Sequence, residues 1–284
     1  MKNDEIDSDG LVARISGKWT SEKHFYLQRY IEIFETSMKL KFQKRNYIDL
    51  FAGSGRNYLR ETKTFVDGSP LIALNAQNPF TGYIFIEKSK RRITALQSRC
   101  ENRFHDRVFT FYLGDCNIKV DEVIKYTGIN QALNLAFIDP DGLEVNWSTI
   151  EKLASIKRMD MIINYSEGGI NRAIGKFVKS ENSDCLSQYF GTVDWKEIYA
   201  DYQRKKNFNL HRSFIDLIMT KLEKLGYVSV ESIQVNMEPL IRNSKRNAPQ
   251  YRLLFASKHE LGNNFWKKIT DKDNHGQSRL PMNF

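Results

Sequence analysis

The stretch NYIDLFAGSGRN, residues 46–57, decides the fold of this chain. It is an apolar run of strand character followed by a turn that contains Gly53 and Gly55. Glycine has no Cβ atom, so the backbone can turn sharply at these positions and approach a ligand closely. A strand that ends in such a turn is typical of open α/β sheets, which bind ligands outside the carboxyl ends of their strands.

Further apolar runs follow this stretch and alternate with amphipathic segments, the pattern of βαβ units around a parallel sheet. The predicted strands are residues 46–51, 82–87, 109–114, 133–139 and 159–165. The predicted helices between them are residues 70–77, 88–104, 117–127 and 147–157. An earlier helix is predicted over residues 20–43, where Leu27, Tyr30, Ile31 and Phe34 recur at helical spacing.

These elements divide the chain into four parts. The polar, acidic residues 1–17 are predicted to be a mobile tail, and residues 18–170 a Rossmann-like core with its N-terminal helix. Residues 171–225 are predicted to be a helical insertion. Residues 226–284 are predicted to supply strands 227–235 and 251–258, the last of them antiparallel, and then a polar surface tail.

An acidic residue lies in or just after each of the first four predicted strands: Asp49, Glu87, Asp115 and Asp139. The carboxyl ends of parallel strands share one edge of a sheet, so these carboxylates are expected to line one cleft. Glu87 stands where Rossmann proteins place an acid that accepts hydrogen bonds from ribose hydroxyls. Asp115 could hold an adenine amine, and Asp139, before Pro140, would lie deepest in the cleft, where a second substrate would dock.

A dinucleotide is the other cofactor that such a sheet could bind. The glycine pattern argues against it, because no third glycine opens the following helix as GxGxxG requires. The carboxylates of Glu87, Asp115 and Asp139 also suit hydroxyl and cationic groups better than a pyrophosphate, since like charges repel.

The formal net charge of +9 makes nucleic acid the leading class of partner, although lysine-rich proteins often bind none. Three cysteines without a CxxC pair favour a reducing cytoplasm. The five histidines show no HxH or HxxxH spacing, so no metal site is predicted. No run approaches the ~18 apolar residues of a membrane span. Cys116 beside Asp115 could be a nucleophile, but a small buried thiol is the commoner role.

DLFAGSG resembles motif I of class I methyltransferases, and several further segments together resemble the three-Cys-motif partner protein (TcmP) family. They are residues 18–34, 47–57, 67–74, 84–89, 114–117, 137–143 and 251–266. The resemblance implies a Rossmann-like class I methyltransferase fold that binds S-adenosylmethionine, and a three-cysteine partner similar to radical-SAM enzymes. Motif I falls on Asp49, Phe51, Ala52, Gly53 and Gly55. The ribose acid falls on Glu87, the adenine side on Asp115 and Cys116, and the catalytic loop on Asp139 and Pro140.

Two features depart from the family pattern. The catalytic loop reads Asp-Pro-Asp-Gly, so Asp141 stands where base amino-methyltransferases have an apolar or aromatic residue. The insertion from Arg56 to Val66 also lengthens the interval from Gly55 to Glu87 well beyond the ~20 residues of a compact βαβ unit. It could cover the amino-acid end of the cofactor or replace that site.

The substrate would meet two further features at the same edge. Tyr165 could stack on a base, or it could be a buried aromatic residue. The basic loop 237–249 could contact phosphates through Arg242, Lys245 and Arg246, or it could be a solvated hairpin loop.

The sequence therefore leaves two hypotheses. The first is methyl transfer from S-adenosylmethionine to a nucleic acid or its component, with Asp139 and Pro140 at the acceptor. The second is a non-catalytic partner subunit that binds nucleotide or nucleic acid, for instance in bacterial phage defence. Asp141 and the insertion after Gly55 favour the second.

Overall fold

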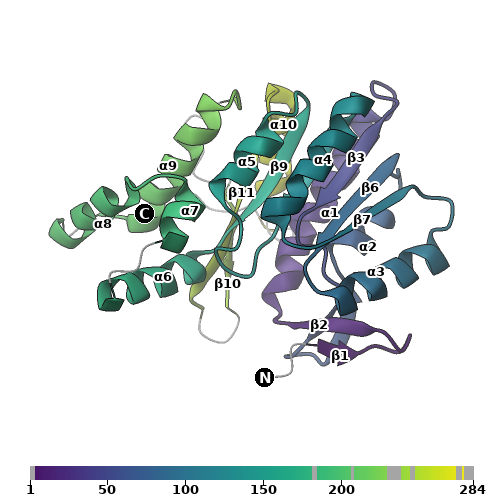
Figure 1. Ribbon diagram of the computed structural model, residues 1–284, viewed down its shortest axis with the longest axis horizontal. Helices are drawn as coiled ribbons and strands as arrows, with labels where there is room; N and C mark the ends of the chain where they lie inside the picture. The colour runs from purple at the N-terminus through teal and green to yellow at the C-terminus, as the bar shows by residue number, and fades with distance from the viewer. Residues whose placement is uncertain are drawn as a thin grey trace.

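The computed structural model describes residues 4–180, 184–205, 208–228, 238–243, 247–272 and 277. Seven strands form the central sheet, in the order β10-β11-β9-β8-β3-β6-β7 (Figure 1). In chain order they are β3 (Arg45–Asp49), β6 (Gly82–Glu87), β7 (Phe109–Leu113), β8 (Leu133–Ile138), β9 (Met159–Tyr165), β10 (Leu240–Arg242) and β11 (Pro249–Ala256).

The strand order confirms the predicted fold class. If these seven strands are numbered 1 to 7 in chain order, their order across the sheet, starting from β7, is 3-2-1-4-5-7-6. The last strand, β11, pairs antiparallel with both β9 and β10, and the strands from β9 to β7 are parallel. This is the Rossmann-like arrangement of class I methyltransferases, and its parallel strands bring their carboxyl ends to one edge.

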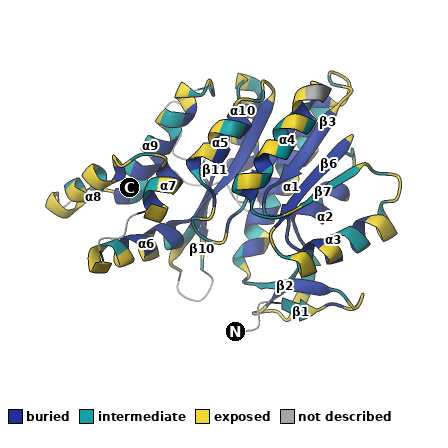
Figure 2. Ribbon diagram, in the orientation of Figure 1, coloured by how far each residue is buried: buried dark blue, intermediate teal, exposed yellow. Residues whose placement is uncertain are grey.

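Helices cover both faces of the sheet, so the central strands β3, β6 and β9 are buried along their whole length. Figure 2 shows these strands buried beneath helices that are exposed only on their outer sides. One face packs against α1 (Trp19–Met38), α2 (Ser69–Leu74), α3 (Lys90–Arg103) and α10 (Glu260–Thr270). The other packs against α4 (Cys116–Asn130), α5 (Trp147–Ala154), α6 (Glu167–Ser180), α7 (Asp184–Phe190) and α9 (Leu210–Lys224). Together with α8 (Trp195–Arg204), helices α6 to α9 occupy the segment predicted to be helical.

The N-terminal residues differ from the expected mobile tail. Residues Asp4–Ile6 form β1 and Val12–Ser16 form β2, and β2 pairs in parallel with β4 (Arg56–Leu59). Strand β5 (Thr64–Asp67) completes a four-stranded sheet, called the small sheet below. The insertion after Gly55 is therefore a hairpin that the N-terminal strands extend. Figure 1 shows this sheet at one end of the molecule, near the start of α1.

The C-terminal part also needs correction. Residues 259–284 were expected to be a polar surface tail, yet α10 buries Phe265, Trp266 and Ile269 against α1 and the sheet. The sixth strand was expected at residues 227–235, of which 229–235 lie outside the described residues; the strand that the structure shows is β10. Among the described residues, no helix is both long and apolar enough to cross a membrane.

Candidate functional site

The glycine turn after β3 has the backbone shape that only glycine adopts easily. Gly53 has φ +63° and Gly55 has φ +79°, both in the left-handed region. A Cβ atom at Gly55 would also lie 2.8 Å from a Leu96 methyl carbon, closer than real contacts allow. The turn is tied to the neighbouring strand, because the amide of Ala52 donates to the carbonyl oxygen of Ile86 at 2.9 Å.

Glu87, at the end of β6, is part of this turn. Its Oε2 accepts a hydrogen bond from the Gly53 amide at 2.9 Å, and its Oε1 accepts one from the Ser89 amide at 2.7 Å. The side chain is largely buried. A carboxylate offers about four lone-pair positions, so Glu87 can still accept two hydrogen bonds, as a ribose diol would require.

Asp49 lies beneath the turn and not in the cleft. Its side chain is fully buried, and its carboxylate accepts hydrogen bonds from the Phe51 amide at 3.1 Å and the Tyr47 hydroxyl at 3.2 Å. Burial raises its pKa to about 7. The predicted ligand contact is therefore replaced by a structural one: Asp49 fixes the main chain of Phe51, which does line the cavity described below.

Asp115 and Cys116 open α4 at the end of β7. Asp115 caps the helix by accepting from the Asn117 amide at 2.9 Å, and the exposed Lys88 ammonium lies 3.5 Å away from its other oxygen. The Gly114 amide donates to the Glu87 carbonyl oxygen, which keeps Asp115 near Glu87 along the sheet edge. Cys116 is buried in the core, and burial raises its pKa to about 12, which excludes a thiolate nucleophile.

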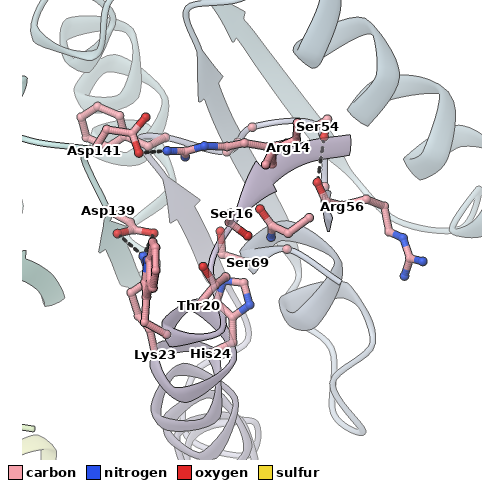
Figure 3. A pocket seen from close by; sticks show the side chains of 18 of the residues that line it. Arg14, Ser16, Thr20, Lys23, His24, Ser54, Arg56, Ser69, Asp139 and Asp141 are labelled. Atoms are coloured by element: carbon pink, nitrogen blue, oxygen red, sulfur yellow. Dashed lines mark hydrogen bonds and ion pairs between the residues drawn. The ribbon is translucent and has the colours of Figure 1, made fainter. Parts of the chain in front are cut away.

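Asp139, just after β8, is held by two side chains. Its Oδ1 accepts a hydrogen bond from the Lys23 ammonium at 2.7 Å (Figure 3). The same oxygen accepts one from the Asn164 side-chain amide at 2.7 Å. The Lys23 and Asp139 side chains are only 8% and 14% exposed. Lys23 comes from α1, so the first helix reaches the cleft and supplies a cation to the residue expected to be catalytic.

The next acid in the same loop has a cation partner too. Asp141 forms an ion pair with Arg14 of β2, so this pair joins the loop after β8 to the small sheet (Figure 3). Asp141 is 63% exposed, which puts this pair at the surface, in contrast to the buried Lys23–Asp139 pair.

A cavity of about 160 Å³ lies between the small sheet, the glycine turn and the loop after β8. Of the predicted residues it is lined by Phe51, Ala52, Gly53, Gly55, Asp139 and Pro140, but not by Glu87 or Asp115. Its other walls include residues that the sequence analysis did not assign to the site: Arg14, Ser16, Thr20, Lys23, His24, Arg60 and Tyr251. His24 is buried there, and burial lowers its pKa to about 3, so its ring is neutral at neutral pH.

Lys23 could have been found from the helical pattern. Leu27 and Tyr30 belong to the buried stripe of α1, and Lys23 and Thr20 continue that stripe one and two turns earlier. A lysine on the apolar face of a helix needs a carboxylate partner, and Asp139 is that partner.

Tyr165 is not available for stacking on a substrate. It is fully buried, and its hydroxyl group lies 2.8 Å from Nδ1 of His211. Successive residues of a strand face opposite sides of the sheet, so Asn164 points toward Asp139 while Tyr165 joins the core beneath α6 and α9.

Arg242 ends β10 and is not in a loop. Because β10 runs parallel to β9 across the antiparallel β11, Arg242 lies at the same edge of the sheet as the glycine turn. It donates to the Asn247 carbonyl oxygen at 2.8 Å. Lys245 and Arg246 lie outside the described residues. Among the residues that are described, no cluster of three or more histidine, cysteine, aspartate or glutamate side chains could hold a metal ion.

Comparisons with known proteins add little to this geometry. The chain matches no model of a protein family, and no curated protein is similar to it. A solved protein of Legionella pneumophila from the DUF519 family is 13% identical, covering 63% of this chain and 76% of its own, with a TM-score of 0.44. The Synechocystis magnesium protoporphyrin IX methyltransferase ChlM, solved with bound SAM, is 10% identical, covering 86% and 85%, with a TM-score of 0.38. Such weak similarities carry no argument of their own, and the strand order defines the fold.

Proposed function

We propose that this protein is an S-adenosylmethionine-dependent methyltransferase that acts on a nucleic acid or one of its components. The observation that carries the proposal is the hydrogen bond from the Gly53 amide to Glu87, next to a cavity that Gly53 and Asp139 line. It joins the ends of β3 and β6 where open α/β sheets bind a nucleoside.

The residues fit the cofactor in three respects. Glu87 retains two acceptor positions for ribose hydroxyls. Asp115 lies beside Glu87, and its half-exposed carboxylate can accept from an adenine amine. The glycine turn presents its backbone to a cavity that can take the amino-acid end. When bound, S-adenosylmethionine supplies a methyl group on a positively charged sulfur, which makes the methyl electrophilic.

The acceptor side is the task of Asp139 and its two partners. Lys23 and Asn164 fix the carboxylate in one orientation, so it can align an acceptor group and take up its proton. Arg242 at the same edge would contact a phosphate of the substrate.

Calorimetry with S-adenosylhomocysteine tests the cofactor. Binding with a micromolar Kd is the expected result, and no detectable heat at millimolar ligand would overturn the proposal. Asp139→Asn keeps an oxygen that can accept from Lys23 and Asn164, but it removes the charge and the second oxygen that faces Lys23. It should retain S-adenosylhomocysteine binding and lose at least a hundredfold in methyl transfer to mixed single-stranded oligonucleotides, since a positioned base contributes about 10²–10⁴.

A second function is a non-catalytic subunit that binds nucleotide or nucleic acid. The observation that favours it is the pairing of both loop acids with cations, Asp139 with Lys23 and Asp141 with Arg14. A carboxylate that is already neutralised is a weaker base. This function predicts oligonucleotide binding without any response to S-adenosylhomocysteine.

The resemblance to the TcmP family extends this proposal to a partner. The protein would then work with a three-Cys-motif protein similar to radical-SAM enzymes, in bacterial phage defence. Co-expression of the two proteins tests this, because a complex should elute as one species in size-exclusion chromatography, and separate elution would count against it.

A further inference from the structure

The cavity beneath the small sheet is too small for a whole nucleoside. Its volume of about 160 Å³ is below the roughly 300 Å³ at which pockets for complete small molecules begin. It is therefore suited to one compact group of a larger ligand, and its walls define the chemistry of that group.

The first indication is a buried hydroxyl group with no partner. Within the described residues, the Ser16 Oγ atom is shielded from solvent and makes no hydrogen bond, although Ser16 lines the cavity. A buried polar atom without a partner destabilises the fold unless a ligand supplies one. The neighbouring backbone is fixed, because the Arg60 amide donates to the Ser16 carbonyl oxygen at 3.1 Å.

The second indication is the glycine turn itself. Ser54 and Gly55 line the same cavity, and in the described part of the chain their amides make no hydrogen bond. The left-handed Gly53 and Gly55 shape this turn. Consecutive free amides in a turn of this kind form a concave site that favours an anion.

The third indication is the balance of charge. Four cations line the cavity, namely Arg14, Lys23, Arg56 and Arg60, against the two carboxylates of Asp139 and Asp141. Those carboxylates are matched by Lys23 and Arg14.

The two remaining arginines differ in their partners. Arg56 pairs with Asp7 and Asp67, and Figure 3 shows its side chain pointing away from the cavity centre. Arg60 has no carboxylate partner among the described residues, and its guanidinium group lies over the Trp19 ring, 5.7 Å from the centroid. One positive charge at the cavity is therefore left for a ligand.

We propose that the small sheet makes this cavity an oxyanion site, which binds a phosphate or carboxylate group through the Ser16 hydroxyl, the Ser54 and Gly55 amides and the Arg60 guanidinium. Hydroxyl, amide and guanidinium groups are all donors, and a charged acceptor strengthens each of their hydrogen bonds. The group could be a phosphate of the acceptor or the carboxylate of the cofactor. Only the identity of the ligand rests on the proposed function.

Calorimetry on the full chain tests the site with two probes. The first is inorganic phosphate. The second is S-adenosylhomocysteine, whose affinity is compared with that of 5′-methylthioadenosine. The latter lacks the amino-acid end and therefore its carboxylate. Ser16→Ala and Arg60→Gln should each weaken binding of at least one probe by roughly ten- to a hundredfold, the loss expected for one hydrogen bond to a charged group.

Arg29→Gln is the matched control. Arg29 lies over the Phe25 ring, 5.3 Å from the centroid, and does not line the cavity, so this variant removes the same charge and a similar ring contact. It should leave binding unchanged. Ser16→Ala should also unfold at the same denaturant concentration as the parent or a higher one, because it removes an unpaired buried hydroxyl.

The two probes separate the sources of the oxyanion. If the variants lose only phosphate binding, the site binds a phosphate of the acceptor. If they lose only the preference for S-adenosylhomocysteine over 5′-methylthioadenosine, the site binds the carboxylate of the cofactor. Phosphate binding that depends on Arg60 in a protein that ignores S-adenosylhomocysteine would keep the oxyanion site and overturn the proposed function. Unchanged affinities in both variants, or no binding of either probe, would overturn the oxyanion site.

Discussion

Two carboxylates at the same edge of the sheet are held in opposite ways. At the glycine turn, Glu87 accepts hydrogen bonds from two backbone amides and has no cation partner among the described residues. On the acceptor side, Asp139 is held by the Lys23 ammonium and the Asn164 side chain. A carboxylate bound by amides fixes the main chain and keeps its charge for a ligand, whereas one bound by a buried lysine is neutralised in place.

Removing the carboxylate of Asp139 should lower the free energy of unfolding the most. Asp139→Ala leaves Lys23 buried without its carboxylate, and losing one partner of a buried ion pair costs about 3–5 kcal/mol. Urea unfolding of the purified variant measures this. The double variant Lys23→Met, Asp139→Leu should recover most of the loss, because apolar side chains of similar size often replace a buried pair without cost. A double variant as unstable as Asp139→Ala would show that the Asn164 contact matters more than the charge.

Removing the Glu87 carboxylate at the glycine turn should lower the free energy of unfolding by less, about 2–3 kcal/mol. Glu87→Ala removes two charge-assisted hydrogen bonds but leaves only neutral amides behind. Hydrogen exchange followed by NMR gives a local readout, since the Gly53 and Ser89 amides should lose protection. The Phe51 amide, bonded to Asp49, is the internal control and should change less. Unchanged protection at Gly53 would contradict the proposed coupling of the two strand ends.

Features encoded within a short stretch of the chain were the ones that the sequence could predict. The core strands were predictable because β3, β6, β8 and β9 lie in short, largely apolar segments that are buried on both faces. The glycine turn and the acids near it are encoded within a few residues of a strand end. Helix α10 was also within reach, since Phe265, Trp266 and Ile269 recur at helical spacing.

Long-range pairing is what the sequence alone did not reveal. The short strand β2, which carries Arg14 and Ser16, pairs locally with β1, but its other edge pairs with residues 57–59, more than 40 positions away. Charges hold this segment as well: Arg99 of α3 binds Asp9 at 2.7 Å, and Arg56 binds Asp7 at 2.8 Å. The Lys23–Asp139 pair spans 116 positions. No local pattern encodes such partners.

The third prediction concerns Asp49, which is buried at the glycine turn and accepts hydrogen bonds only from neutral groups. Its pKa of about 7 in the folded protein lies above the ordinary value of 3.8, so the folded state holds the proton more tightly than the unfolded chain. The stability from this group is complete below about pH 3.8 and is lost as the pH rises to about 7.

Asp49→Asn should remove this contribution, which amounts to a slope of up to about 1.4 kcal/mol per pH unit between pH 4 and 7. Urea unfolding at several pH values measures the slope. Glu35 and Asp160, whose pKa values burial raises to about 7 and about 6, keep a residual slope of the same sign. The control is Asp121→Asn, which removes an exposed carboxylate on α4 that pairs with Lys152 and should leave the slope intact. If the Asp49→Asn variant kept the parent's slope, Asp49 would be ionised in the fold, and the contrast between a protonated Asp49 and an ion-paired Asp139 would not hold.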